Sequence, residues 1–233
     1  MSDIIKADIY KLDNPAFYSL SETHSNFALS LHGMKFYNPI YCPFGGWKRH
    51  PCIDTEQGIA NYAQETSSFY VIGQKPIFGD NMILSKELIC DQMLLESPLN
   101  IEINEEIIEI RTDSERNELY QLVNLVQPGY FREKTPQLGN YYGIYKNNRL
   151  VAVTGERMKM DKFTEISDVV THPDHIGRGY AKQLVSFTCE KIFMEDRIPY
   201  LHVAESNFQA IALYKKLGFR TRRKMSFWGF ERK

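Results

Sequence analysis

The chain has 233 residues, of which 43% are hydrophobic and 24% are charged. This ordinary globular composition excludes an intrinsically disordered protein. Lys and Arg number 28 and Asp and Glu number 29, so the formal net charge is −1. A near-neutral chain has no overall field to gather polyanions, which argues against nucleic acid or an acidic membrane as a partner. Aromatic residues make up 13%, which indicates a large core or large apolar pockets.

The sequence has no recognisable targeting signal and no standard metal-binding motif. The opening sequence MSDIIKADIY lacks the basic stretch and apolar run of a secretory signal, and no segment approaches the roughly 20 apolar residues of a membrane span. The cysteines show no CxxC spacing, so we expect free thiols in a reducing cytoplasm. Cys42, His50 and Cys52 lie close together in CPFGGWKRHPC, but a fourth ligand is missing, so we expect no metal site.

The first hundred residues contain short elements of mixed type. The residue patterns predict, in chain order, a short helix at 21–32, irregular strand and loop at 35–47, a helix at 55–66 and a strand at 68–72. The apolar segment 82–95 is compatible with either a strand or a helix. Ser97-Pro98 follows it as a candidate domain boundary.

From residue 106 the hydrophobic pattern becomes regular. Asp113 or Ser114 is the expected N-cap of the first helix, and Lys146 to Arg149 is a typical hairpin turn. The order β-α-β-β-β-α-β-α-β predicts an α+β or mixed α/β layer, with helices covering a central sheet. The expected strands are 107–111, 141–145, 150–158, 163–171, 200–204 and 221–230, and the expected helices are 113–126, 179–193 and 207–217.

The segment from Thr171 to Leu184, THPDHIGRGYAKQL, is typical of an anion site. Gly177 and Gly179 allow backbone N–H groups to turn inward, and the helix that follows adds the positive end of its dipole. The same pattern also occurs in ordinary turns. The lysine of a P-loop and the third glycine of a dinucleotide fingerprint are both missing.

A second motif follows in ESNFQAIALYKKLGF, residues 205–219. Together, DVVTHPDHIGRGYAKQL and the N-x-x-A-x-x-L-Y-x-K-x-G-F stretch resemble the GNAT superfamily of acyl-CoA-dependent N-acyltransferases, and the resemblance covers residues 107–230. The THPxxxGxGYA pattern is most similar to the glycine-N-acyltransferase-like branch. The resemblance implies an acyltransferase domain at 99–233 with a mostly antiparallel sheet flanked by helices. It also implies that residues 1–98 form an N-terminal α/β extension or half-domain.

The resemblance also implies where acyl-CoA binds. The loop that holds the pyrophosphate follows the pattern Q/R-x-x-G-x-G/A, from which Ile176 departs. The strand before the loop would pair its main chain with the pantetheine arm. The residues assigned to the cofactor are Val169, Val170, Thr171, Ile176, Gly177, Arg178, Gly179, Tyr180, Ala181, Lys182, Asn207 and Tyr214. Solvated charge for Arg178, helix capping for Asn207 and core packing for Tyr214 are the alternatives left open.

Two catalytic roles are carried over in the same way. Glu165 lies 11 positions before Ile176 and matches the strand glutamate that serves as base in the histone-type branch. We expect partial desolvation to raise its pKa. Asp168 is the rival base and would face the opposite side of a regular strand unless a bulge intervenes, and His202 is a third candidate. Tyr214 is the expected general acid.

The expected function is the transfer of an acetyl or other acyl group from acyl-CoA to a primary amine, by direct transfer in a ternary complex. A small molecule or an amino acid is the expected acceptor, and residues 36–47 are expected to cover its side of the site. A catalytically inactive CoA-binding sensor or scaffold is the alternative. A nucleotide-binding protein that uses the glycine loop is a third reading, and association into a homodimer is left open.

Overall fold

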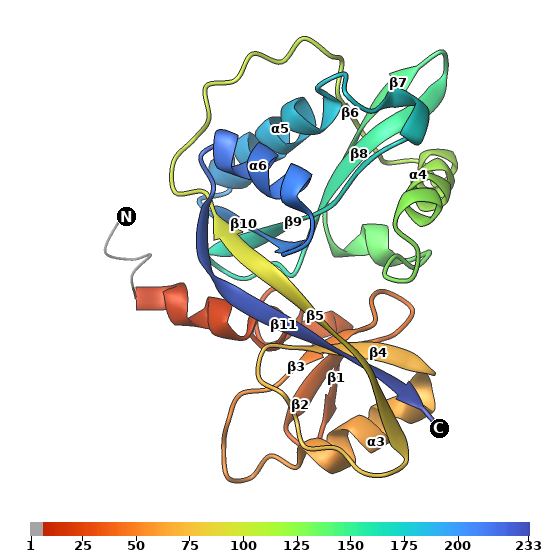
Figure 1. Ribbon diagram of the computed structural model, residues 1–233, viewed down its shortest axis with the longest axis vertical. Coiled ribbons are helices and arrows are strands. Elements are labelled where there is room, and N and C mark those ends of the chain that lie inside the picture. The colour runs from red at the N-terminus through yellow and green to blue at the C-terminus, as the bar shows by residue number, and fades with distance from the viewer. Residues whose placement is uncertain (1–6) are drawn as a thin grey trace.

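The computed structural model describes residues 7–233 and contains one mixed sheet with helices on its faces (Figure 1). Among these residues the strand order is β1-β2-β3-β4-β11-β5-β10-β9-β8-β7-β6. Neighbouring strands are antiparallel except for the pairs β3–β4 and β9–β10. The mixed α/β class, with a mostly antiparallel sheet flanked by helices, is confirmed.

The α-helices of the described residues are α2 (Pro15–Ser19), α3 (Thr55–Glu65), α4 (Asp113–Val126), α5 (Tyr180–Met194) and α6 (Phe208–Lys216). The strands are β1 (Ala28–Leu31), β2 (Met34–Tyr37), β3 (Phe44–Gly46), β4 (Ser68–Ile72), β5 (Met82–Leu94), β6 (Ile108–Glu109), β7 (Tyr141–Lys146), β8 (Arg149–Arg157), β9 (Phe163–Thr171), β10 (Ile198–Ala204) and β11 (Arg220–Arg232).

Two long strands connect the two ends of the molecule. β5 and β11 pair from Arg220 opposite Leu94 to Arg232 opposite Met82, and Figure 1 shows them running from the part that carries α5 and α6 to the part that carries α3. β5 also pairs with β10 on its other side. A strand from the first hundred residues is therefore central to the sheet. The division of the chain near residue 98 stays a prediction, and the sheet itself continues across it.

The parallel neighbours β9 and β10 separate soon after they begin. Their pairing runs only from Ile198 opposite Phe163 to Tyr200 opposite Glu165. β9 then continues to Thr171, and β10 continues to Ala204 while it pairs with β5. The divergence leaves the backbone edge of β9 beyond Glu165 without a ladder partner from β10 among the described residues. The sheet therefore splays between β9 and β10.

The pattern of the first hundred residues was partly misread. The helix expected at 21–32 is wrong, because this segment is a turn followed by β1. Phe27, Leu29 and Leu31 recur every second residue, which is the period of a strand. The ambiguous segment 82–95 is strand β5, while α3 and β4 lie where they were expected.

The second half follows the predicted elements closely, with small corrections. The strand expected at 107–111 is reduced to β6, Ile108–Glu109. Asn147 and Asn148 have φ angles of 52° and 59°, as a two-residue hairpin turn between β7 and β8 requires. On α4, Leu119, Leu122 and Val123 are buried, whereas Val126 at its end is 41% exposed.

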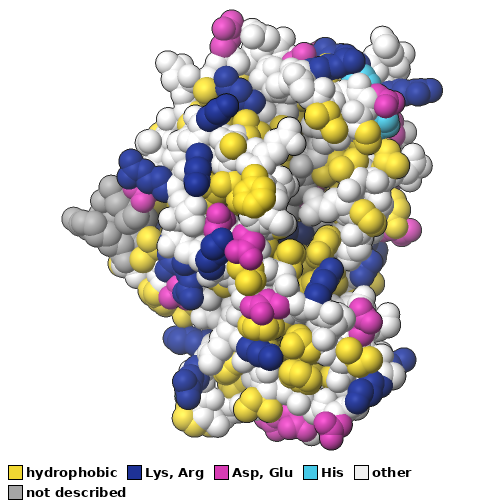
Figure 2. Space-filling view, viewed as in Figure 1, with side chains coloured by type: hydrophobic (Ala, Val, Ile, Leu, Met, Phe, Trp, Pro, Cys, Tyr) yellow, Lys and Arg dark blue, Asp and Glu magenta, His cyan; other side chains and the backbone are white. Residues whose placement is uncertain are grey.

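The abundant aromatic residues form much of the core beneath α3. The rings of Phe36 and Tyr62 stack with centroids 4.1 Å apart, and Phe69 packs edge-on against both and stacks on Phe230. Most aromatic side chains of the predicted cover at 36–47 are therefore core residues. On the surface, basic and acidic side chains are interspersed, and hydrophobic side chains border a hollow near the middle of the face in Figure 2. Among residues 7–233, no helix is both long and apolar enough to cross a membrane.

The N-cap of α4 is Thr112, not Asp113 or Ser114. The Thr112 hydroxyl oxygen accepts from the N–H of Glu115, and the Glu115 carboxylate accepts from the N–H of Thr112 at 2.8 Å. This reciprocal capping box satisfies two donors that the helix itself leaves unpaired.

We predict that Thr112→Ala lowers the free energy of unfolding by about 1 kcal/mol, because the capping hydroxyl is lost. Ser114→Ala is the matched control at an exposed position of the same turn, and we expect it to change stability by less than about 0.5 kcal/mol. Urea denaturation of the three proteins measures both values. Equal losses in the two variants would show that the capping box does not stabilise α4.

Candidate functional site

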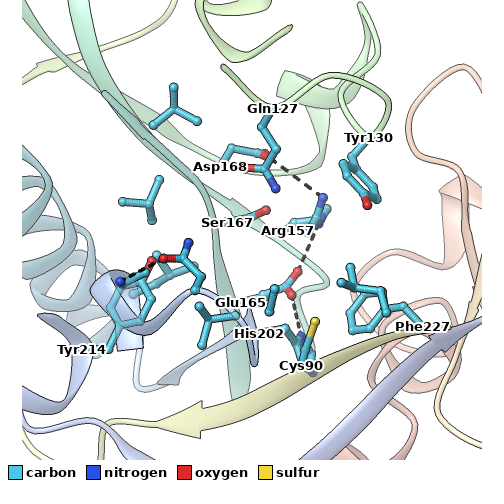
Figure 3. A pocket seen from close by; sticks show the side chains of 18 of the residues that line it. Cys90, Gln127, Tyr130, Arg157, Glu165, Ser167, Asp168, His202, Tyr214 and Phe227 are labelled. Carbon is cyan, nitrogen blue, oxygen red and sulfur yellow. Dashed lines mark hydrogen bonds and ion pairs between the residues drawn. The ribbon is translucent and has the colours of Figure 1, made fainter. Parts of the chain in front are cut away.

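A cavity of about 390 Å³ lies where β9 and β10 diverge. Side chains from both parts of the sheet line it, together with the end of α4 and one face of α6 (Figure 3). Its lining residues are Phe44, Leu88, Cys90, Val126, Gln127, Tyr130, Arg157, Glu165, Ile166, Ser167, Asp168, Val169, Val170, Thr171, His202, Val203, Ala204, Asn207, Ala210, Tyr214 and Phe227.

The floor of this cavity is a buried charge cluster centred on Arg157, at the end of β8. Arg157 Nε lies 3.1 Å from Glu165 Oε2, and Arg157 Nη1 lies 4.0 Å from Asp168 Oδ1. The guanidinium stacks over the ring of Phe44, with its carbon 4.6 Å from the ring centroid. The side chain of Glu165 is 1% exposed and that of Arg157 is 10% exposed. Such a pair is costly to bury and must be well partnered to persist.

His202 fixes the other oxygen of Glu165. His202 Nδ1 lies 2.7 Å from Glu165 Oε1, and Nε2 lies 3.0 Å from the side-chain nitrogen of Gln92. The orientation of the Gln92 amide is set by its other contacts, because its nitrogen donates to the Leu12 carbonyl and its oxygen accepts from Arg222. Nε2 of His202 must then accept and Nδ1 must donate, so the imidazole donates a hydrogen bond from Nδ1 to Glu165.

Glu165 is consequently held as a charged anchor. Burial opposes its charge, but the positive charge of Arg157 and the hydrogen bond from His202 outweigh burial, so the pKa of Glu165 is lowered. The expectation of a raised pKa is wrong. The reason is that Arg157, which no motif of the sequence indicated, compensates the desolvation.

Asp168 has the opposite electrostatic balance. Burial raises the pKa of Asp168, with a further contribution from the charge of Glu165, although Arg157 and the Tyr141 hydroxyl oppose the shift. Tyr141 Oη donates to Asp168 Oδ2 at 2.8 Å. Asp168 is therefore the carboxyl group in this cavity whose pKa is moved toward neutrality, which suits a proton acceptor.

A bulge brings Asp168 to the same side as Glu165. In the pairing of β8 with β9, Val153 lies opposite Val170 and Gly155 lies opposite Ser167, so β9 has one extra residue. Asp168 sits in this bulge with a φ of 52°, a conformation that non-glycine residues adopt rarely. Regular alternation would put Glu165 and Asp168 on opposite faces. The bulge, which the sequence analysis left open, decides otherwise.

The backbone edge of β9 beyond Glu165 forms one wall of the cavity. Val169, Val170 and Thr171 line the cavity, and on the other side β9 pairs with β8. The edge that faces β10 has free N–H and C=O groups, since the ladder to β10 ends at Glu165. An extended chain with amide groups can add to such an edge as a strand does.

The glycine loop begins after β9 and ends at α5. Gly177 and Gly179 have φ angles of 82° and 77°, and Gly179 is the N-cap of α5. A Cβ atom at either glycine would meet no atom within 4 Å, so open space surrounds both. The first amides of α5, from Tyr180 to Lys182, have no partner within the helix. The loop therefore offers a cradle of backbone donors that fits a pyrophosphate.

The side chains of this loop contribute less to the anion cradle than its backbone amides do. Ile176 is 61% exposed, so its departure from Gln or Arg leaves the amide cradle intact. Arg178 and Lys182 are exposed cations, and Arg178 Nη2 lies 3.4 Å from the Asp174 carbonyl. The ring of Tyr180 is buried against β7 and β8, with Ala181 following it in the first turn. None of the residues from Ile176 to Lys182 lines the cavity described above.

α6 brings Asn207 and Tyr214 to the cavity wall. Asn207 caps the helix, because its Oδ1 accepts from the N–H of Ala210 at 3.1 Å. Tyr214 is buried among apolar side chains, and burial raises the pKa of its hydroxyl. The phenol is therefore protonated at neutral pH and can donate a proton. Both residues line the cavity and also have the capping and packing roles left open above, so their functional roles stay predictions.

Several cavity residues were missed by the sequence analysis. Arg157, Tyr130 and Phe227 belong to no motif, and they come from three separated segments. A weak signal for Arg157 is a charged residue at the end of the apolar strand VAVTGER, whose other residues are buried. Cys42 is buried and Cys52 is exposed, so they do not share a site. Among residues 7–233, no three His, Cys, Asp or Glu side chains are grouped as metal ligands.

The opposite pKa shifts predict opposite effects on stability. The charged form of Glu165 is favoured by folding, so this contribution is present above the ordinary pKa of 4.5 and is lost as the pH falls through the lowered value. Glu165→Gln is therefore less stable than the wild type above pH 4.5, with a deficit that shrinks at lower pH. The charged form of Asp168 is disfavoured, so Asp168→Asn gains stability relative to the wild type as the pH rises from 3.8. Denaturant unfolding across this range measures both differences. A deficit in Asp168→Asn that grows with pH would contradict the assignment.

Comparisons with known proteins agree with this fold. Residues 141–228 match the family model of FR47-like proteins. A protein of Novosphingobium aromaticivorans assigned to the GNAT family of acetyltransferases is 27% identical, with a TM-score of 0.86, and the match covers 95% of this chain and 98% of that chain. No curated protein matches the chain.

Two further structures share the fold at low identity. A GCN5-related N-acetyltransferase from Kribbella flavida has a TM-score of 0.60 at 12% identity, over 93% of this chain and 95% of that chain. A GCN5-related N-acetyltransferase-like protein from Streptococcus suis has a TM-score of 0.61 at 12% identity, and the match covers 97% of this chain and 98% of that chain. The glycine-N-acyltransferase-like branch stays a prediction. The chain has the fold of the GCN5-related N-acetyltransferases, the GNAT superfamily, and its residues 141–228 match the FR47-like model.

Proposed function

We propose that this chain is an acyl-CoA-dependent N-acyltransferase that acylates a primary amine of a small molecule by direct transfer in a ternary complex. The observation that carries the proposal is the meeting of the free edge of β9, the raised-pKa carboxyl of Asp168 and the protonated Tyr214 at one cavity. A cytoplasmic location and a homodimer stay predictions.

The chain offers acyl-CoA two sets of backbone groups. The amides of the loop from Gly177 to Lys182 would bind the pyrophosphate, with Arg178 and Lys182 as nearby cations. The edge of β9 from Val169 to Thr171 would pair with the amides of the pantetheine arm. Because backbone groups provide most of these contacts, a chain with a net charge of −1 can still bind a polyanion.

The side chains of the cavity provide proton transfer. Asp168 would accept a proton from the ammonium form of the acceptor, and the neutral amine would attack the thioester carbonyl carbon. As the new C–N bond forms and the C–S bond breaks, Tyr214 would donate its proton to the departing thiolate and recover one from the amide nitrogen through solvent. Glu165 does not titrate in this scheme. It holds Arg157, and Arg157 holds Asp168.

We predict that Gly179→Glu abolishes CoA binding, because a carboxylate in the loop repels the phosphates and strains a backbone with a φ of 77°. Gly129→Glu is the matched control, since Gly129 also has a positive φ and open space around it. We expect the control to bind CoA as the wild type does. Calorimetric titration measures the affinities, and unchanged affinity in Gly179→Glu would contradict the loop assignment.

We predict that Asp168→Asn and Tyr214→Phe each lower turnover about 100-fold, because a positioned acid or base contributes on that order. Release of the CoA thiol is measured against pH, with an acceptor whose own pKa lies outside the measured range. Asp168→Asn should lose the fall in rate at low pH, whereas Tyr214→Phe should keep it. Tyr145→Phe, which removes a buried hydroxyl elsewhere, is the control and should turn over normally.

Two results would change this assignment. If the turnover rate of Glu165→Gln no longer falls at low pH while that of Asp168→Asn still does, Glu165 is the base. If CoA binds but no amine releases the thiol, the chain is instead a CoA-binding sensor or scaffold.

A further inference from the structure

The cavity has two chemically different sides. Figure 3 shows Tyr214 on one side and Tyr130 and Phe227 on the other, with Arg157 and its carboxylates between them. On the proposed function, acyl-CoA occupies the side of β9 and α6. The acceptor must then approach from the side of Tyr130 and Phe227, and the chemistry of that side selects it.

The acceptor side is walled by aromatic and aliphatic groups. The ring centroid of Phe44 lies 5.8 Å from that of Phe227 and 6.1 Å from that of Tyr130. Leu88 of β5 completes the wall, with the thiol of Cys90 beneath it. These groups come from four separate segments, so the wall exists only in the folded chain. An apolar surface of this kind stabilises an apolar substituent of similar size and has no partner for a charged one.

The charges near this wall favour one ammonium group and disfavour a second. Glu165 and Asp168 face a single cation, Arg157, so the floor has one carboxyl group in excess. Arg157 is engaged by both carboxylates and stacked on Phe44, which leaves it unsuited to a substrate carboxylate. Lys86 lies over the rings of Tyr70 and Tyr130, 5.2 and 5.6 Å from their centroids, where its charge would repel a second ammonium.

We propose that the acceptor is a primary amine that carries one aromatic or similarly sized apolar group and no second ammonium group. Its ammonium group meets Asp168 while its apolar group lies against Phe44, Phe227 and Tyr130. A cavity of about 390 Å³ is within the usual range for small ligands. The proposal rests on the proposed function and narrows its acceptor, because polyamines become poor substrates.

The test compares matched amines at saturating acetyl-CoA, with thiol release as the readout. We expect kcat/KM for 2-phenylethylamine to exceed that for 1,4-diaminobutane and a lysine-containing peptide by at least about tenfold, a difference that corresponds to a modest apolar contact. Higher kcat/KM for the diamine or the peptide would overturn the proposal and leave the acyltransferase function intact.

Variants of the wall test the contact itself. Tyr130→Ala, at a half-buried position outside the sheet, and Phe227→Ala should each raise KM for 2-phenylethylamine about tenfold and leave KM for ethylamine within about twofold. Phe227→Leu should restore most of the loss. CoA affinity and the thermal midpoint establish that each variant is folded. Equal effects on both amines in Tyr130→Ala would contradict the assigned wall.

If no amine is turned over, the amine site is tested by binding alone. Calorimetric titration of 2-phenylethylamine into the CoA-loaded protein measures that binding. Binding that Tyr130→Ala weakens about tenfold supports the amine site although the acyltransferase function fails. Absence of binding overturns the amine site as well.

Discussion

One buried guanidinium organises the chemistry of this protein. Arg157 pairs with Glu165, lies near Asp168 and stacks on Phe44, and it is almost fully removed from water. Two carboxylates could not both be buried beside each other without a cation between them. Burial raises the pKa of Asp168, whereas in Glu165 the charge of Arg157 and the hydrogen bond from His202 outweigh burial and lower the pKa. The opposite pKa shifts of these two neighbouring carboxyl groups assign their different chemical roles.

The divergence of β9 from β10 supplies the place for that chemistry. Parallel pairing ends at Glu165, so the backbone edge of β9 becomes available just where the carboxylates lie. The bulge at Asp168 turns this side chain to the same side as Glu165, at the cost of an unfavourable backbone conformation. The long pairing of β5 with β11 closes the other side and brings residues of the first hundred against the site. The cavity that contains the strained Asp168 is therefore lined from both ends of one continuous sheet.

The aromatic excess of the composition has two separate destinations. Of the rings of residues 36–47, Phe36 and Trp47 pack into the core beneath α3 and Tyr37 packs into a second core cluster, which the sequence could not distinguish from a cover over the site. Phe44 alone of these rings reaches the cavity, where it meets Tyr130, Phe227 and the guanidinium of Arg157. The aromatic residues thus contribute to selection of the acceptor only through side chains that lie far apart in the sequence.

The sequence by itself determined the elements of the second half, the glycine loop before α5, the α6 motif and the mixed α/β class, because these depend on local periodicity, turn residues and contiguous motifs. It placed Glu165, Asp168 and Tyr214 as candidates, with Glu165 as the leading base and Asp168 as its rival. The opposite pKa shifts of the two carboxyl groups depend on Arg157 and His202, which approach from other strands, and on a bulge that has no marker in the sequence. Only the tertiary structure decides such matters, because a pKa depends on burial and on charges brought near through space, whereas a helix or a turn is encoded by neighbours along the chain.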